Sequence, residues 1–230
     1  MEAEEYLNGQ IIIVDKPLKW TSFQVVNKLR WALKTKYKLK KLKVGHAGTL
    51  DPLATGLLIL CTGKFTKKID ALQAEIKEYT GTFFLGATTP SYDLETEIKE
   101  TFPSEHITKK QVLEATKLFL GEIDQTPPLF SALKKDGVRL YEIARRGETT
   151  EIKSRKTTIF EFEITKINLP TIDFRVVCGK GTYIRSLAND FGKSLGSGAH
   201  LIALRRTKSG EFDVENAIDP IDFVDNLLQK

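Results

Sequence analysis

Cysteine and histidine, the residues that most often bind transition metals, are scarce in this sequence. Its 230 residues include three histidines and two cysteines, and their spacing resembles no zinc or deaminase site. Cys61 and Cys178 each lie in an apolar run that predicts a strand. We therefore expect buried, reduced thiols in a cytoplasmic protein rather than a disulfide, and no bound metal.

Nucleotide-binding and hydrolase motifs are missing as well. Gly63-Lys64 is followed by Phe65 and lacks the upstream glycine of a phosphate-binding loop. No Gly-x-Gly-x-x-Gly follows the first expected strand, and no Gly-x-Ser-x-Gly elbow is present. Residue counts leave a serine–histidine–acid triad open. The chemistry favoured by these absences is a carboxylate nucleophile that needs neither metal nor cofactor.

Long apolar runs are absent too. The longest, around Leu57 to Cys61, is far shorter than the roughly 18 residues that a membrane span needs. The acidic start, Glu2 to Glu5, lacks the layout of a secretory signal. An apolar content of 41% is ordinary for a globular protein of one large domain, with or without an insertion. We expect no membrane association.

Acidic residues are missing from one long stretch. Ten Lys or Arg residues and no Asp or Glu lie between Lys16 and Leu50, although the net charge of the chain is only +5. A second basic segment, from Lys134 to Lys156, has eight basic and four acidic residues. A one-signed surface suits a polyanionic partner. A solvated lysine face is the competing interpretation of a charge run taken alone.

Periodicity and turn residues predict the secondary structure. Strands are expected at 10–14, 57–61, 75–85, 157–167, 171–178 and 201–204. Helices are expected near 22–33, 64–72, 108–120, 140–146, 184–195 and 221–228. The first helix has Thr21 or Ser22 as its cap, and its apolar positions are Phe23, Val26, Leu29, Ala32 and Leu33. The helix that starts at Thr108 has the capping-box pattern Thr108-x-x-Gln111 and is expected to end at Gly121. Lys134-Lys135-Asp136-Gly137 is expected to form a hairpin tip. The order favours an α+β fold with a largely antiparallel sheet, in one domain (1–230) with an insertion at 125–156.

A glycine-rich bend holds one carboxylate. Gly45, Gly48 and Gly56 mark a backbone that turns or is closely approached, and Asp51 lies between them. Pro52 biases Asp51 toward an extended conformation, outside any helix. An ordinary Asp-Pro turn is the simpler interpretation of this dipeptide alone.

The bend resembles the signature of the TruB family of tRNA pseudouridine synthases. The residues that carry the resemblance are Gly45-His46-Ala47-Gly48-Thr49-Leu50-Asp51-Pro52-Leu53-Ala54-Thr55-Gly56. Further matches follow the family's order: Val14-Asp15-Lys16-Pro17, Tyr79, Leu129-Phe130-Ser131-Ala132-Leu133-Lys134, Lys180-Gly181-Thr182-Tyr183-Ile184-Arg185, and Gly198-Ala199-His200-Leu201 with Leu204-Arg205-Arg206. The resemblance covers about residues 8 to 210 and implies the pseudouridine synthase fold, a mixed sheet flanked by helices with a thumb-like insertion at 125–156.

The resemblance assigns three residues to the reaction. Asp51 matches the catalytic aspartate, which attacks the uridine at its sugar or its base. Arg185 matches the arginine that pairs with this aspartate and would hold it oriented and ionised. Tyr79 matches the tyrosine that stacks on the flipped uracil.

Four further residues match substrate-binding positions. Tyr183 and Leu204 match positions that line the base pocket. His46 matches the histidine that enters the RNA loop in place of the extruded nucleotide. Lys16 matches a lysine beside the cleft that either contacts phosphate or supports the fold.

The resemblance also implies the partner. The expected substrate is uridine 55 in the T-loop of tRNA, reached by base flipping without cofactor or metal. The basic stretches 16–50 and 125–156 are expected to contact the T-arm. We expect a monomer that needs no protein partner.

Two departures from the family bear on this expectation. Ala47 stands where threonine or serine is common, and only about twenty residues follow Ser209-Gly210, so no C-terminal PUA module is expected. One alternative is a relative of the guide-RNA-dependent pseudouridine synthases, which share the signature but need that module and protein partners. The other is a tRNA-binding or folding module with secondary catalysis.

Overall fold

The computed structural model describes residues 2–229, which form two compact units. The first unit takes residues up to Tyr79 and from Leu204 onward, and the second takes Thr80–Ala203. Strands β4 (Lys77–Leu85) and β12 (Ala199–Ser209) contribute residues to both. The single domain expected from the sequence stays a prediction, and each unit is described by itself.

The first unit is built around β3 (Ala54–Thr62). β1 (Ile11–Lys16) pairs antiparallel with residues 56–61 of β3, and β2 (Val44–Ala47) pairs antiparallel with the last four residues of β3. Three residues of β12 pair parallel with its first three residues, and β13 (Phe212–Asp213) pairs with β12. The sheet is therefore mixed.

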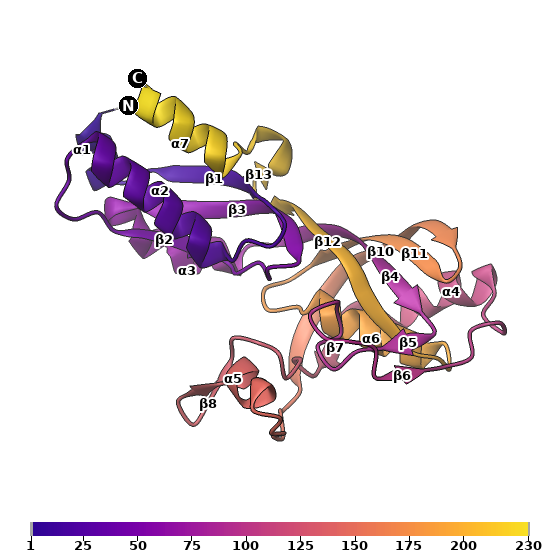
Figure 1. The fold of residues 1–230 in the computed structure, drawn as a ribbon. Coiled ribbons are helices and arrows are strands. Elements are labelled where there is room, and N and C mark those ends of the chain that lie inside the picture. The colour runs from indigo at the N-terminus through magenta and orange to yellow at the C-terminus, as the bar shows by residue number, and fades with distance from the viewer. Residues whose placement is uncertain (1, 230) are drawn as a thin grey trace. The chain divides into compact units, whose positions relative to one another are not determined.

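Helices cover both faces of this sheet. Leu58 and Leu60 pack with α2 (Ser22–Lys36) and α7 (Pro220–Gln229), which lie side by side in Figure 1. Leu57 and Ile59 pack on the other face, against α3 (Ile69–Ala74) and the 3-10 turn at Val214–Asn216. Burial on both faces explains why β3 reads as a continuous apolar run. A short helix α1 (Ala3–Asn8) and a 3-10 helix (Gly63–Lys68) complete the unit.

Helix α2 begins as predicted, and of its predicted apolar face only Phe23 lies outside the core. Thr21 is the cap and forms a capping box with Gln24. Phe23, predicted to be buried, is 60% exposed, so that prediction was wrong. Ser22 and Val25 lie four residues before Val26 and Leu29, and both are buried, so the buried stripe runs through them and leaves Phe23 at its edge.

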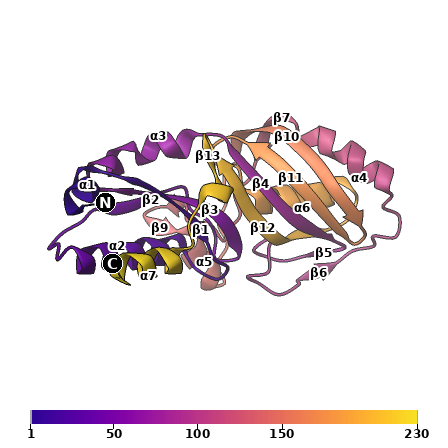
Figure 2. The same cartoon turned by 90° about the horizontal axis from the view of Figure 1, so that it is seen from above.

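In the second unit the strand order is β12-β4-β11-β10-β7. β10 (Arg155–Asn168) pairs antiparallel with β11 (Thr171–Cys178) and with β7 (Gly121–Gln125), and Figure 2 shows these strands with α6 (Ile184–Ser194). The core is a cluster of phenylalanine rings, among them Phe83 and Phe174, whose centroids lie 4.1 Å apart. Rings from β10 and α6 contact the same cluster.

Several boundaries differ from prediction. Helix α4 (Lys109–Ala115) starts at the predicted Thr108 cap but passes into a 3-10 turn (Thr116–Phe119). Gly121 directly follows the C-cap residue Leu120 with a φ of 84°, as predicted for the end of this helical segment, and it is also the first residue of β7. β12 is longer at both ends than the predicted 201–204. Loop 86–103 contains the short pair β5 (Ala87–Thr88) and β6 (Glu100–Thr101).

The insertion has the predicted hairpin. β8 (Lys134–Lys135) pairs with β9 (Val138–Arg139), and α5 (Leu140–Arg145) follows. Asp136 and Gly137 between the strands both have positive φ, 52° and 82°, as a two-residue hairpin turn requires. Both cysteines are buried and neither forms a disulfide within residues 2–229, as expected. No helix within residues 2–229 has the length and apolar character to cross a membrane.

Candidate active site

Asp51 lies in the turn between β2 and β3, and its neighbours fix the backbone there. The buried Ser22 Oγ accepts a hydrogen bond from the Leu50 N–H (2.9 Å) and is 3.1 Å from the Leu50 carbonyl oxygen. The Lys19 N–H donates to the Pro52 carbonyl (2.7 Å), and the Ala54 N–H donates to that of Asp51 (3.1 Å). The half-buried Asp51 side chain therefore projects from a turn held on both sides.

Lys16 is the last residue of β1 and pairs with Gly56 of β3. Its side chain is fully buried, and its Nζ donates to the carbonyl oxygens of Pro17 (2.9 Å) and Trp20 (2.6 Å). Burial lowers the pKa of Lys16 to about 8, and attraction to Asp51 partly opposes the shift. Of the two roles expected for Lys16, these contacts favour support of the fold.

Arg206 is the residue that sequence reasoning missed. Its guanidinium is buried, with Nε donating to the Leu57 carbonyl (2.7 Å) and one terminal nitrogen donating to that of Gly48 (3.2 Å). The signal was its place in the matched Leu204-Arg205-Arg206 segment, in which only Leu204 was assigned a role. It ties β12 to both sides of the Asp51 turn.

Gly56 explains one glycine of the signature. It has φ of +102°, and a Cβ there would lie 2.3 Å from the Arg206 carbonyl oxygen. A side chain would therefore break the parallel pairing of β3 with β12. The close approach predicted at this bend is made by the chain's own strand.

His46 lies in β2, half-buried, two residues before Gly48. Burial and the nearby Arg206 charge lower its pKa, partly opposed by the Gly48 backbone. A lowered pKa favours a neutral ring at physiological pH. A neutral ring suits the predicted insertion into an RNA loop better than a cation does, because it is less costly to desolvate.

Tyr79 and Leu204 also belong to the first unit. Both are half-buried and pack against the core cluster that contains Leu50 and Ala54, which flank the Asp51 turn. An adjacent ion pair joins the β1 and β12 motifs, because Arg205 makes two hydrogen bonds to the Asp15 carboxylate, of 2.9 and 2.6 Å. The structure thus gathers Lys16, His46, Asp51, Tyr79 and Leu204 within one unit.

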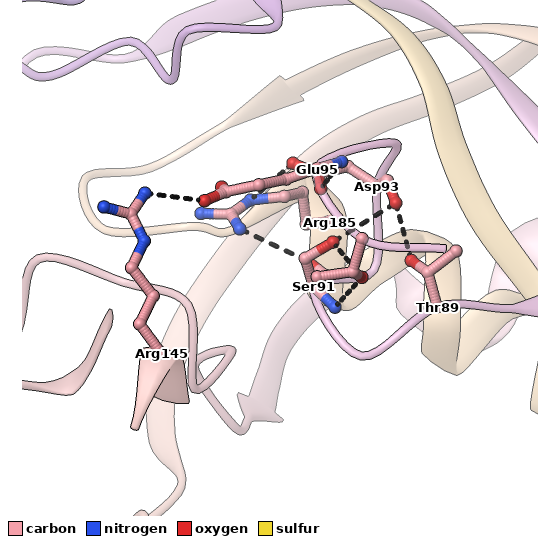
Figure 3. A network of polar contacts seen from close by, with 7 residues as sticks. Thr89, Ser91, Asp93, Glu95, Arg145 and Arg185 are labelled. Atoms are coloured by element: carbon pink, nitrogen blue, oxygen red, sulfur yellow. Dashed lines mark hydrogen bonds and ion pairs between the residues drawn. The ribbon is translucent and has the colours of Figure 1, made fainter. Parts of the chain in front are cut away.

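Arg185 lies in the second unit, buried in the first turn of α6. It donates a hydrogen bond to the Ser91 carbonyl (3.2 Å), and its Nε is 3.7 Å from the Asp93 carboxylate. Figure 3 shows this network, in which the Thr89 hydroxyl also donates to the Asp93 carbonyl (2.6 Å). Loop 86–103 therefore orients Arg185. Asp51 belongs to the other unit, so the predicted pair of Asp51 with Arg185 stays a prediction.

Tyr183 is held by the two ends of the insertion. Gln125 and Arg155, which face each other across β7 and β10, both contact this segment. The Gln125 side chain bonds both the N–H (2.7 Å) and the carbonyl (3.1 Å) of Tyr183, and the Arg155 guanidinium lies 4.9 Å from the Tyr183 ring. Further along the insertion, Arg145 pairs with Glu95 (2.9 Å; Figure 3). The insertion thus contacts both segments around Arg185.

The first unit offers the Asp51 carboxylate on a fixed turn, and the second unit by itself offers the buried, oriented Arg185 guanidinium. A carboxylate held on a fixed turn is suited to act as a nucleophile. Within residues 2–229, no three histidine, cysteine or acidic side chains are grouped so as to hold a metal ion.

Known proteins resemble this chain over its whole length. The model described as "TruB family pseudouridylate synthase (N terminal domain)" matches residues 34–184, and "tRNA pseudouridylate synthase B C-terminal domain" matches 185–230. The tRNA pseudouridine synthase B of Flavobacterium johnsoniae is 69% identical over 228 residues, covering 99% of this chain and 100% of the relative. That of Parabacteroides distasonis is 55% identical over 225 residues, covering 98% and 96%.

Two solved structures have a similar fold. The crystal structure of a Cbf5-Nop10-Gar1 complex contains a chain with 32% identity and a TM-score of 0.72, covering 98% of this chain and 56% of that one. The structure of an H/ACA RNP bound to a substrate RNA containing 2′-deoxyuridine has 30% identity and a TM-score of 0.69, covering 98% and 55%. The present chain therefore spans about half the length of each.

Proposed function

Because this chain belongs to the TruB family of pseudouridylate synthases, we propose that it isomerises uridine 55 in the T-loop of tRNA to pseudouridine. Family membership itself makes the chain an isomerase that forms pseudouridine in tRNA, and the expected α+β pseudouridine synthase fold is confirmed. The proposal adds the position in the tRNA, the nucleophile and base flipping. The observation that carries it is the braced turn that presents Asp51 within the family signature.

In the proposed reaction, the Asp51 carboxylate attacks the flipped uridine. The bond between the ribose and the base nitrogen breaks, the freed uracil rotates, and a bond forms from the ribose to carbon 5 of the base. The bond that Asp51 formed with the sugar or the base breaks again, which releases the carboxylate. The proton lost from carbon 5 balances the one gained by the nitrogen, so the product is an isomer. Tyr79 stacks on the base, while Tyr183 and Leu204 line its pocket. A stacked, enclosed base keeps its orientation to the ribose while it is detached.

Arg185 is the proposed partner of the Asp51 carboxylate. Its orientation by Ser91 and Asp93 supports a fixed guanidinium rather than a mobile surface cation. A bidentate arginine–carboxylate pair stabilises the charged form of the acid and fixes its direction. Lys16 holds the connection between β1 and α2 through its bonds to Pro17 and Trp20, and the Lys19 N–H of that connection donates to the Pro52 carbonyl of the Asp51 turn.

RNA recognition is proposed to rest on the basic stretches 16–50 and 125–156. Contacts of lysine and arginine with phosphates would hold the T-arm, and the neutral His46 would fill the space left by the flipped nucleotide. We propose that the chain acts in the cytoplasm as a monomer, without a protein partner or cofactor.

The decisive experiment incubates wild type, Asp51→Asn and Asp51→Ala with unmodified tRNA and maps pseudouridine by position. Asp70→Asn serves as the matched control, because Asp70 is an exposed carboxylate on α3 of the same unit. We expect product at position 55 from wild type and the control alone. Equal yield from Asp51→Asn would refute the nucleophile assignment, and product at another position would refute the proposed target.

The same assay separates the two alternatives. The structural similarity to a chain from a Cbf5-Nop10-Gar1 complex raises a guide-dependent enzyme as a second candidate. Turnover by the purified chain on tRNA without added RNA or protein would exclude it. A tRNA-folding module would show tRNA binding by wild type but no product dependent on Asp51.

A further inference from the structure

Two adjoining hollows lie along the exposed side of α2. The first, of about 500 Å³, is lined by Trp20, Gln24, Asn27, Lys28 and Trp31. The second, of about 660 Å³, is lined by Asn27, Arg30, Trp31, Lys34, Thr35, Lys38 and Leu39. Because Asn27 and Trp31 line both, the hollows form one surface, which we call the α2 groove. Nothing in the reaction proposed above uses it.

An exposed tryptophan is the central feature of the α2 groove. Trp31 is 54% exposed, whereas the core-facing residues of the same helix, such as Leu29 and Leu33, are buried. Lys28 Nζ lies 5.9 Å from the Trp31 ring centroid, so a cation already sits beside the ring. The chain has two tryptophans, and both line this groove. A large, rigid aromatic surface left in water is typical of a binding surface.

The charge of the α2 groove indicates the kind of partner. Its charged lining residues are all basic: Lys28, Arg30, Lys34 and Lys38. Arg30 donates to the Asn27 side-chain oxygen, which orients both groups at the junction of the hollows. A basic groove around an exposed aromatic ring is the combination with which proteins bind single-stranded nucleic acid, because every base has a face that stacks.

We propose that the α2 groove binds an unpaired nucleotide of the RNA substrate, distinct from the uridine that is isomerised. The base stacks on Trp31, and the neighbouring phosphates contact Lys28, Arg30, Lys34 and Lys38. That the RNA is tRNA rests on the function proposed above, whereas the stacking does not. Such a contact adds to RNA affinity without taking part in catalysis.

The test uses the tryptophan fluorescence of the full chain, which reports on this groove. The Trp20→Phe variant leaves Trp31 as the sole reporter. We expect single-stranded oligouridine to quench its fluorescence and a duplex RNA of equal length to quench it far less, because paired bases are not free to stack. Equal quenching by the duplex, or by heparin, would overturn the stacking proposal in favour of charge attraction alone.

Binding measurements complete the test. Base–aromatic stacking of about 1–3 kcal/mol predicts that Trp31→Ala weakens RNA binding by roughly 5- to 150-fold, while Trp31→Tyr retains most of the affinity. Phe23→Ala is the matched control, because Phe23 is an even more exposed aromatic on α2 that lines neither hollow. Equal loss of affinity in Trp31→Ala and Phe23→Ala would overturn the proposal.

Two further outcomes separate this inference from its alternatives. The Asp51→Asn variant should show undiminished quenching, so an inactive enzyme that still quenches refutes only the proposed reaction. Product at position 55 without quenching by RNA refutes only the groove.

A second copy of the chain is the competing occupant of the α2 groove. Its signature is a molecular mass in solution that rises with protein concentration and that the Trp31→Ala substitution reduces to the mass of a monomer. That result, together with no quenching by RNA, would overturn the proposal.

Discussion

Replacing Ser22 with alanine tests whether α2 braces the catalytic turn. The Ser22 hydroxyl bonds both the N–H and the carbonyl of Leu50, the residue directly before Asp51. Leu50 is 3% exposed, so water cannot easily replace the hydroxyl. Ser22→Ala therefore leaves two buried backbone groups of the turn unsatisfied.

The magnitude follows from these two groups. An unsatisfied buried donor or acceptor costs about 1–3 kcal/mol, and partial relaxation of the turn reduces the cost. We expect Ser22→Ala to lower the free energy of unfolding by about 2–4 kcal/mol. Activity should fall as well, mainly in kcat, because a displaced Asp51 loses its alignment with the substrate while most RNA contacts remain.

The assay pairs denaturant unfolding with steady-state turnover and uses Ser209→Ala as control. Ser209 is also buried, on β12 of the same unit, and its hydroxyl has no hydrogen-bond partner among residues 2–229. The two variants therefore remove the same atom from similar burial and differ in the bonds lost. Similar unfolding free energies for the two, or a Ser22→Ala enzyme with unchanged kcat, would refute the bracing argument.

Two further predictions concern Lys16 and Gly56. Burial lowers the pKa of Lys16 to about 8 in the fold, below its ordinary value in the unfolded chain. Below about pH 8 the buried side chain is charged, which lowers the free energy of unfolding. This loss is recovered as the pH rises from about 8 toward the usual lysine range. The unfolding free energy of wild type should accordingly rise relative to Lys16→Met by up to about 3 kcal/mol between pH 7 and 10, whereas parallel curves from denaturant titrations would contradict the shifted pKa. Gly56→Ala should destabilise the fold by about 3 kcal/mol or more in the same unfolding assay, because its Cβ would meet the Arg206 backbone at 2.3 Å. Gly147 also has a positive φ, but a Cβ there would meet nothing within 4 Å, so Gly147→Ala should lower the free energy of unfolding by only about 1 kcal/mol. Equal destabilisation by the two substitutions would show that backbone strain alone accounts for the effect at Gly56.

Local signals in the chain were sufficient for much of the fold. The cap at Thr21 (predicted as Thr21 or Ser22), the capping box at Thr108, the Asp136-Gly137 turn and the apolar run of β3 each depend on a few neighbouring residues, and each was predicted. The burial of Phe23 was predicted wrongly because the prediction used only its apolar character. Whether the core covers an apolar residue at the edge of the buried stripe of α2 depends on the tertiary structure. The end of α4 was missed because a 3-10 turn has no distinct periodicity.

By itself the sequence determined the element types, the glycine-rich bend with Asp51, and a motif set specific enough to indicate the family. Only the tertiary structure decided which groups hold that bend. Ser22 lies 28 residues before Leu50, and Arg206 lies 149 residues after Leu57. Likewise, the Gln125 amide and the Arg155 guanidinium meet the Tyr183 segment only because β7 pairs with β10. Hydrogen bonds and ion pairs act over about 3–4 Å in space, so contacts between distant residues leave no periodic trace in the chain.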